Sequence, residues 1–149
     1  MDDSLFQRQF FRHVQGAEQG KVQDQYYLAM FYKDGRGCER DDVKAAYWYR
    51  KAAEQGHDGA QFNLGVFYCI ERGVPKDYSK AAFWFSKAAE QGNVFAQVAL
   101  ASHYHRGEGV EQDDAKAMFW LKQAAKQGNI NAKRALEFYT ERGQLPYVI

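Results

Sequence analysis

The sequence predicts an all-α protein built from pairs of helices that repeat every 36 residues. The first observation is a nine-residue segment that recurs at this interval, as WYRKAAEQG at 48–56, WFSKAAEQG at 84–92 and WLKQAAKQG at 120–128. The second is that the chain aligns with itself at this period without an insertion or deletion. The third is a count of only two prolines, which permits long helices. A stack of equal units explains such a repeat, since each unit must offer its neighbour the same face.

Residues 1–19 are expected to form a helix that caps the N-terminal end of this stack. They align with the second helix of a repeat, but Arg12 stands where the other copies have a tryptophan. Terminal units of repeat proteins commonly depart from the repeat, because their outer face has no neighbour to pack against. The departure at Arg12 therefore fits a capping position.

Residues 20–56, 57–92 and 93–128 are the three repeats, and each is expected to form two helices. In the first helix of the second copy, apolar residues recur with the spacing of one helical face, at Ala60, Leu64, Phe67 and Tyr68. The segment RGVPKD then interrupts the helix with a glycine and a proline.

The second helix of this copy is expected to begin at Asp77, whose carboxylate can accept hydrogen bonds from free backbone N–H groups. Gly92 is placed to end the helix in the left-handed conformation. The inward stripe of this helix is expected to consist of Ala81, Trp84, Ala88 and Ala89. Small residues at 29, 65 and 101 let the helices approach closely, and the tryptophans are expected to be buried between adjacent units.

Residues 129–149 supply only a first helix, followed by the tail GQLPYVI. Glu137 occupies the column in which the earlier copies have alanine or glycine, so this helix is expected to close the stack. The tail is expected to fold over the last helix, and the alternative is an arm that reaches a neighbour's groove. The whole chain, 1–149, is predicted to form a single domain.

Composition argues against several classes of partner. The formal net charge of +1, with no block of like charges, speaks against nucleic acid. No apolar run approaches the roughly 18 residues that a membrane helix needs, and the start MDDSLFQRQF lacks the pattern of a secretory signal. We therefore expect a cytoplasmic monomer without membrane contact, or a secreted or periplasmic protein if a signal has been removed. Cys38 and Cys69 match no metal or disulfide spacing, so neither a metal nor a cofactor is expected.

The repeat resembles the Sel-1-like repeat (SLR) family, a relative of the tetratricopeptide repeats. Residues 60–92 and 96–128 match the pattern A-x-x-x-L-G-x-x-Y-x-x-G-x-G-V-x-x-D-x-x-K-A-x-x-W-x-x-K-A-A-x-x-G almost throughout. Glu71 departs from it, where the other copies have Gly35 and Gly107. The resemblance implies a right-handed α-solenoid of three to four units. It also implies an adaptor function, and bacterial members are tied to signalling, host interaction, virulence, secretion and toxin immunity.

In tetratricopeptide-like stacks the first helices line a concave groove, and the stripe of each first helix that is not used in packing should face it. Here that stripe is apolar with a few polar edges, which is typical of a groove for a peptide or helix. The predicted partner-binding residues are Tyr26, Met30, Lys33, Phe62, Val66, Cys69, Phe95, Val98, Ser102, His105, Arg134 and Phe138. The alternative is that the N-terminal helix, the C-terminal tail or a second copy covers this stripe.

Catalysis is the competing hypothesis. His103 and His105 point about 200° apart on a helix, so we expect no metal pair, and His103 is expected to be packed in the core. Lys33, Cys69 and His105 align across successive units, and a Cys–His nucleophile pair is conceivable, although the sequence places no orienting acid or oxyanion donor beside it. The β-lactam chemistry described for cysteine-rich members is not expected, because this chain lacks their cysteine pair in each repeat.

The sequence therefore predicts a non-catalytic bacterial interaction module that binds a protein or peptide segment in its groove. An immunity protein that neutralises a toxin is the alternative, because an adaptor and an inhibitor both need only a complementary surface.

Overall fold

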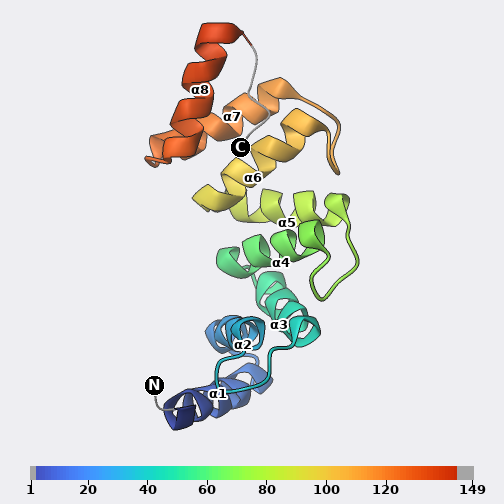
Figure 1. Ribbon diagram of the computed structural model, residues 1–149, viewed down its shortest axis with the longest axis vertical. Coiled ribbons are helices and arrows are strands. Elements are labelled where there is room, and N and C mark those ends of the chain that lie inside the picture. The colour runs from blue at the N-terminus through green and yellow to red at the C-terminus, as the bar shows by residue number, and fades with distance from the viewer. Residues whose placement is uncertain (1–2, 144–149) are drawn as a thin grey trace. The chain divides into compact units, whose positions relative to one another are not determined.

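The computed structural model describes residues 3–143, and within this range the chain forms helices and no strand (Figure 1). The helices are α1 (Asp3–Glu18), α2 (Val22–Asp34), α3 (Asp42–Glu54), α4 (Asp58–Ile70), α5 (Tyr78–Glu90), α6 (Val94–Arg106), α7 (Asp114–Lys126) and α8 (Ile130–Arg142). The predicted all-α fold is confirmed for these residues. None of these helices is long and apolar enough to cross a bilayer. The predicted placement of the tail lies outside the described residues.

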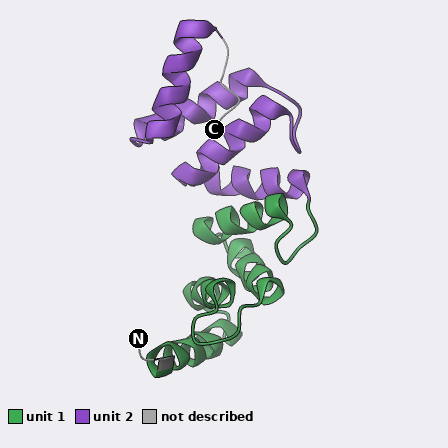
Figure 2. Ribbon diagram, viewed as in Figure 1, with its two compact units in different colours: residues 1–76 green, residues 77–149 purple. Residues whose placement is uncertain are grey.

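The chain divides into two compact units, residues 1–76 with α1 to α4 and residues 77–149 with α5 to α8 (Figure 2). In each unit, helices that follow one another in the chain pack against one another. The boundary falls between the two helices of the second repeat. A single domain over 1–149 and a right-handed superhelix stay predictions.

The 36-residue period is visible in the helices themselves. We call α2, α4, α6 and α8 the first helices, and α1, α3, α5 and α7 the second helices. The aspartate before α3, α5 and α7 accepts a hydrogen bond at Oδ1 from the N–H three residues on: Asp41 from Lys44 at 2.9 Å, Asp77 from Lys80 at 3.0 Å and Asp113 from Lys116 at 3.0 Å. The predicted N-cap at Asp77 is thus confirmed, as is the left-handed Gly92, with a φ of 92° two residues after α5.

The core of each unit includes leucines from the first helices and alanines from the second helices. Leu28, Leu64 and Leu100 are at most 1% exposed. The small-residue column Ala29, Gly65 and Ala101 is fully buried, as expected. The close approach of helices at these positions follows from the absence of a longer side chain.

The buried aromatic column is not the tryptophan column. Trp84 is half-buried, whereas Phe85 is 2% exposed and its ring lies 5.4 Å from that of His103. Tyr49 and Leu121 occupy the same column as Phe85 and are also fully buried. Neighbouring residues on a helix point about 100° apart, so burial of this column leaves the tryptophans at the edge of the packed face. The expectation that Trp84 is buried was therefore wrong.

Pairs of glutamines join successive second helices. Gln25 donates from Nε2 to the carbonyl of Ala17 at 3.3 Å, and its Oε1 accepts from Gln55 at 2.7 Å. In the second unit, Gln97 accepts from Gln127 at 3.0 Å in the same way. Gln25 and Gln97 are buried, and such polar groups are stable in a core only when they are hydrogen-bonded. The bond from a glutamine to an alanine carbonyl recurs every 36 residues, at Gln25, Gln61 and Gln97, and the sequence analysis did not identify it.

Candidate partner-binding surfaces

In the first unit, six of the predicted partner-binding residues lie on two first helices. Three are on α2 (Tyr26, Met30 and Lys33) and three on α4 (Phe62, Val66 and Cys69). All six are half-buried, so each keeps part of its side chain at the surface. Their joint role as a groove stays a prediction.

Tyr26 contacts other aromatic rings of the first unit. Its ring stacks on the imidazole of His57 with centroids 4.2 Å apart, and it lies 6.0 Å from the ring of Tyr49. Burial raises the pKa of the Tyr26 hydroxyl, with smaller contributions from Tyr27 and Asp58. Tyr26 thus also packs against the second helix α3 and the start of α4.

In the second unit, the predicted residues lie on α6 and α8. Phe95 is 63% exposed, which is the largest exposure of an aromatic residue in the predicted set. Val98, Ser102 and Phe138 are half-buried, and Arg134 is exposed. His105 donates from Nδ1 to the carboxylate of Asp114 at 2.7 Å, and its side chain is only 9% exposed. This pairing holds His105 against α7, and a role in binding a partner stays a prediction.

The next residues to consider are those that were weighed for catalysis and metal binding. Cys69 belongs to the first unit and His105 to the second. His103 is 6% exposed and its Nδ1 donates to the carbonyl of Glu108 at 2.8 Å, which confirms the predicted core histidine. Burial raises the pKa of the Cys38 thiol, which donates to the carbonyl of Phe31 at 3.5 Å. Among residues 3–143, no three or more acidic, histidine or cysteine side chains are grouped to hold a metal ion.

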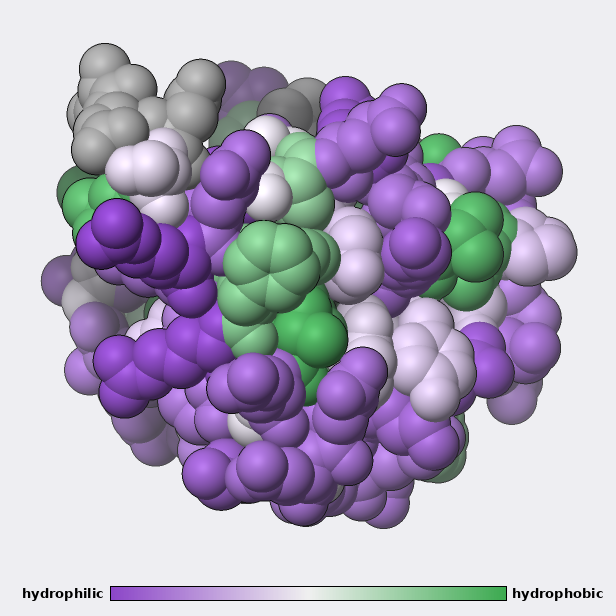
Figure 3. Space-filling model, turned by 90° about the horizontal axis from the view of Figure 1, so that it is seen from below, coloured by the Kyte–Doolittle hydropathy of each residue, from purple (hydrophilic) through white to green (hydrophobic). Residues whose placement is uncertain are grey.

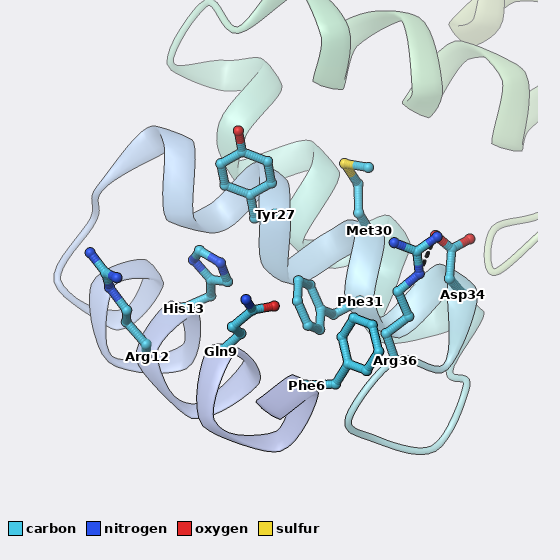
Figure 4. Close-up of a pocket in the computed structure, with 9 residues that line it drawn as sticks. All are labelled: Phe6, Gln9, Arg12, His13, Tyr27, Met30, Phe31, Asp34 and Arg36. Atoms are coloured by element: carbon cyan, nitrogen blue, oxygen red, sulfur yellow. Dashed lines mark ion pairs between the residues drawn. The ribbon is translucent and has the colours of Figure 1, made fainter. Parts of the chain in front are cut away.

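A pocket of about 310 Å³ opens between α1 and α2 (Figure 4). We call it the α1–α2 pocket, and it is lined by Phe6, Gln9, Arg12, His13, Tyr27, Met30, Phe31, Asp34 and Arg36. Aromatic rings and the Met30 side chain form much of its wall, and the charged groups lie at its edge (Figure 4). The sequence analysis assigned only Met30 to a binding surface. The one feature of the sequence that pointed to this pocket was Arg12, which stands where the other copies have a tryptophan.

Exposed aromatic residues also recur on the second helices, in a column that the sequence analysis did not consider. They are 52 to 64% exposed and are Phe11, Tyr47, Phe83 and Phe119. The last three contact the following tryptophan edge-on at 5.0 Å. Their regular 36-residue spacing was visible in the sequence, but only the structure shows that they face solvent.

Paired helices, alanine and glycine contacts and apolar outer stripes define a helical-repeat protein. The particular repeat follows from its sequence, because residues 22–57, 59–93 and 94–129 each match the family model described as Sel1 repeat. The chain belongs to the Sel1 repeat family. Sel1 repeats generally mediate protein–protein interaction and are generally non-catalytic scaffolds.

Solved structures agree with this assignment. A Sel1 repeat protein from Oxalobacter formigenes is 38% identical, with a TM-score of 0.80 over 87% of this chain and 98% of that one. The protein c5321, described as a protective antigen of uropathogenic Escherichia coli, is 33% identical with a TM-score of 0.84. The match covers 96% of this chain but only 34% of c5321.

A more distant structure shares the fold. Cysteine-rich protein B of Helicobacter pylori is 20% identical, with a TM-score of 0.69 over 89% of this chain and 95% of its own length. No curated protein matches the chain in sequence.

Proposed function

We propose that this chain is a non-catalytic adaptor that binds a protein segment through the outward stripes of its first helices. The observation that carries the proposal is the exposure of Phe95 on α6, beside the half-buried Val98 and Ser102. A stripe that served only solubility would carry lysine and glutamate at these positions.

The energetics favour an aromatic anchor. A fully buried aromatic side chain removes on the order of 150–250 Å² from water, and each Å² of apolar surface contributes about 25 cal/mol. Phe95 can still contribute the 63% of its surface that is exposed. The centre of an interface usually depends on a few such side chains. Phe62 on α4 occupies a similar stripe in the first unit and is half-buried.

The family and the relatives support the general role. Likeness to c5321, which is described as a protective antigen, supports including host proteins among the partners to be tested. A cytoplasmic location and a monomeric state stay predictions.

Site-specific photo-crosslinking tests this proposal within the second unit. A photoreactive phenylalanine is placed at Phe95 or, as a matched control, at Phe83, which is 54% exposed on the second helix α5. Irradiation in the native cell should give a discrete protein adduct from position 95 and much less from position 83. An adduct from position 83 alone would move the binding surface to the second helices, and equal yields would remove the support for either.

A further inference from the structure

The α1–α2 pocket lies on a surface of α1 and α2 whose counterpart on the next helix pair, α3 and α4, is buried. A shift of 36 residues maps α1 and α2 onto α3 and α4, so that Gln9 corresponds to Ala45 and His13 to Tyr49. Ala45 and Tyr49 are both 0% exposed, whereas Gln9 is exposed and His13 is half-buried. The face of α3 that carries Ala45 and Tyr49 is therefore buried, whereas the corresponding face of α1 is open.

Helix α2 provides part of this cover on α3 and α4. The ring of Tyr49 lies between Tyr26 of α2, at 6.0 Å, and Phe67 of α4, at 5.4 Å. Just after α4, Arg72 donates from Nη2 to the carbonyl of Lys33 at 3.0 Å, near the C-terminal end of α2. An aromatic contact and a hydrogen bond to the end of a helix thus fix α2 in this position.

The matching groups on α1 and α2 are present, but within the described part of the first unit, residues 3–76, no helix lies across them. His13, which replaces Tyr49, contacts Phe31 at 5.5 Å, as Tyr49 contacts Phe67. Arg36, which replaces Arg72, is 59% exposed and lies 3.7 Å from Asp34 (Figure 4). Phe6 replaces Asp42, the carboxylate that pairs with Arg72. The guanidinium of Arg36 thus faces the rim of an apolar pocket.

The surface beyond the pocket is also partly apolar. Figure 3 looks at the molecule from the α1 end and shows apolar side chains surrounded by hydrophilic ones. Leu5 and Phe11 of α1 are 54 and 64% exposed. Arg12 adds a second positive charge at the rim of the pocket.

We propose that the α1–α2 pocket binds an amphipathic helix of a partner protein, in the position that α2 takes on α3 and α4. The helix places an aromatic side chain against His13 and its C-terminal carbonyls towards Arg36. A helix C-terminus carries a partial negative charge, which complements the two arginines at the rim, whose charge the Asp34 carboxylate beside Arg36 offsets only in part. A pocket of about 310 Å³ holds one or two side chains, which suits a helix anchored by one face.

This inference goes beyond the proposed function, because it concerns α1 and the α1–α2 pocket rather than the outward stripes of α2, α4, α6 and α8. Only Met30 belongs to both surfaces. The two proposals therefore fail independently.

The experiment uses a synthetic peptide with the sequence of residues 21–36, capped at both ends, as the model of the partner helix. The control peptide carries Leu28→Glu and Ala29→Glu, at two of the apolar positions that α2 buries. The full-length protein is labelled at its methionine methyl groups and titrated with each peptide by NMR. Met30 lines the pocket and Met118 lies in the second unit, so Met118 is an internal control.

We expect the peptide to shift the Met30 methyl signal saturably below about 1 mM, without moving that of Met118. Gln9→Trp fills the pocket from an exposed position and should weaken binding at least about tenfold. Arg36→Ala should weaken it about tenfold, through the lost hydrogen bond to a charged group. Gln15→Trp, on an exposed part of α1 outside the pocket, should have no effect, and neither should Phe62→Ala or Phe95→Ala. Circular dichroism verifies that each variant is folded.

Several results would overturn the inference. These are an unmoved Met30 signal, equal shifts from both peptides, or binding that Gln9→Trp leaves intact. A concentration-dependent shift of Met30 in the protein alone, with a doubled mass that Gln9→Trp abolishes, would show that the occupant is a second copy rather than a partner.

Discussion

Gly73→Ala should destabilise the first unit, because this residue stands directly against the start of α3. Gly73 has a φ of 68°, in the left-handed region. A Cβ atom added there would overlap the carbonyl oxygen of Asp42 and lie 3.0 Å from the nitrogen of Val43. Both are backbone atoms, so the clash cannot be relieved by rotating a side chain. Either the loop or the first turn of α3 must move.

The magnitude follows from two contributions. An alanine in the left-handed conformation costs roughly 1–2 kcal/mol, and overpacking against a fixed neighbour costs about 1–3 kcal/mol more. The expected loss is therefore about 2–5 kcal/mol. Gly56→Ala is the matched control, because Gly56 has a φ of 91° and an added Cβ would meet no atom within 4 Å. Its loss should be limited to the conformational contribution, roughly 1–2 kcal/mol.

Urea unfolding followed by circular dichroism measures both variants. Gly73→Ala should lose more free energy of unfolding than Gly56→Ala, by about 1–3 kcal/mol. Gly109→Ala should behave like Gly73→Ala in the second unit, because its Cβ would overlap the carbonyl of Tyr78. If all three variants lost the same amount, the loops would not be held against the second helices as the structure describes.

Three further substitutions test local features by the same unfolding measurement. Glu71 has a φ of 55°, so Glu71→Gly should stabilise the protein by about 1 kcal/mol, and a loss would contradict the strain argument. Phe85→Ala should cost about 3–5 kcal/mol and exceed the loss from Trp84→Ala, because only Phe85 is fully buried. The reverse order would indicate that the tryptophans, not this column, form the buried core. Gln97→Met keeps the side-chain length but removes one of the two acceptors of the Gln127 amide and leaves the carbonyl of Ala89 without its side-chain donor, and should cost about 1–3 kcal/mol. A neutral Gln97→Met would mean that water replaces the glutamine pair.

Local signals predicted the helices well. The 36-residue repeat and the caps depend on residues close together in the sequence, such as Asp77 and the backbone three residues later. The core histidine was also predicted correctly, because His103 shares a column with phenylalanines. These features need no knowledge of how the helices turn against one another.

Features that depend on the rotation of a helix about its axis were harder to predict. Trp84 and Phe85 are both large and apolar, and only the contact with α6 decides which of them is buried. The pair of His105 and Asp114 joins two helices, and no sequence pattern distinguishes it from an exposed histidine. The α1–α2 pocket was missed for a related reason, since it results from a side of α1 that carries no other helix of the first unit within residues 3–76.

The affinity for the partner recovered by crosslinking at Phe95 tests the proposed function most directly. Isothermal titration should show that Phe62→Ala and Phe95→Ala each weaken binding about thirtyfold, or about 2 kcal/mol, while circular dichroism stays unchanged. Lys87→Ala on α5 and Lys122→Ala on α7 should have little effect, because both lysines are exposed on second helices. Binding that survives the two phenylalanine substitutions but is lost with either lysine substitution would contradict the assignment of the partner-binding surface to the first helices.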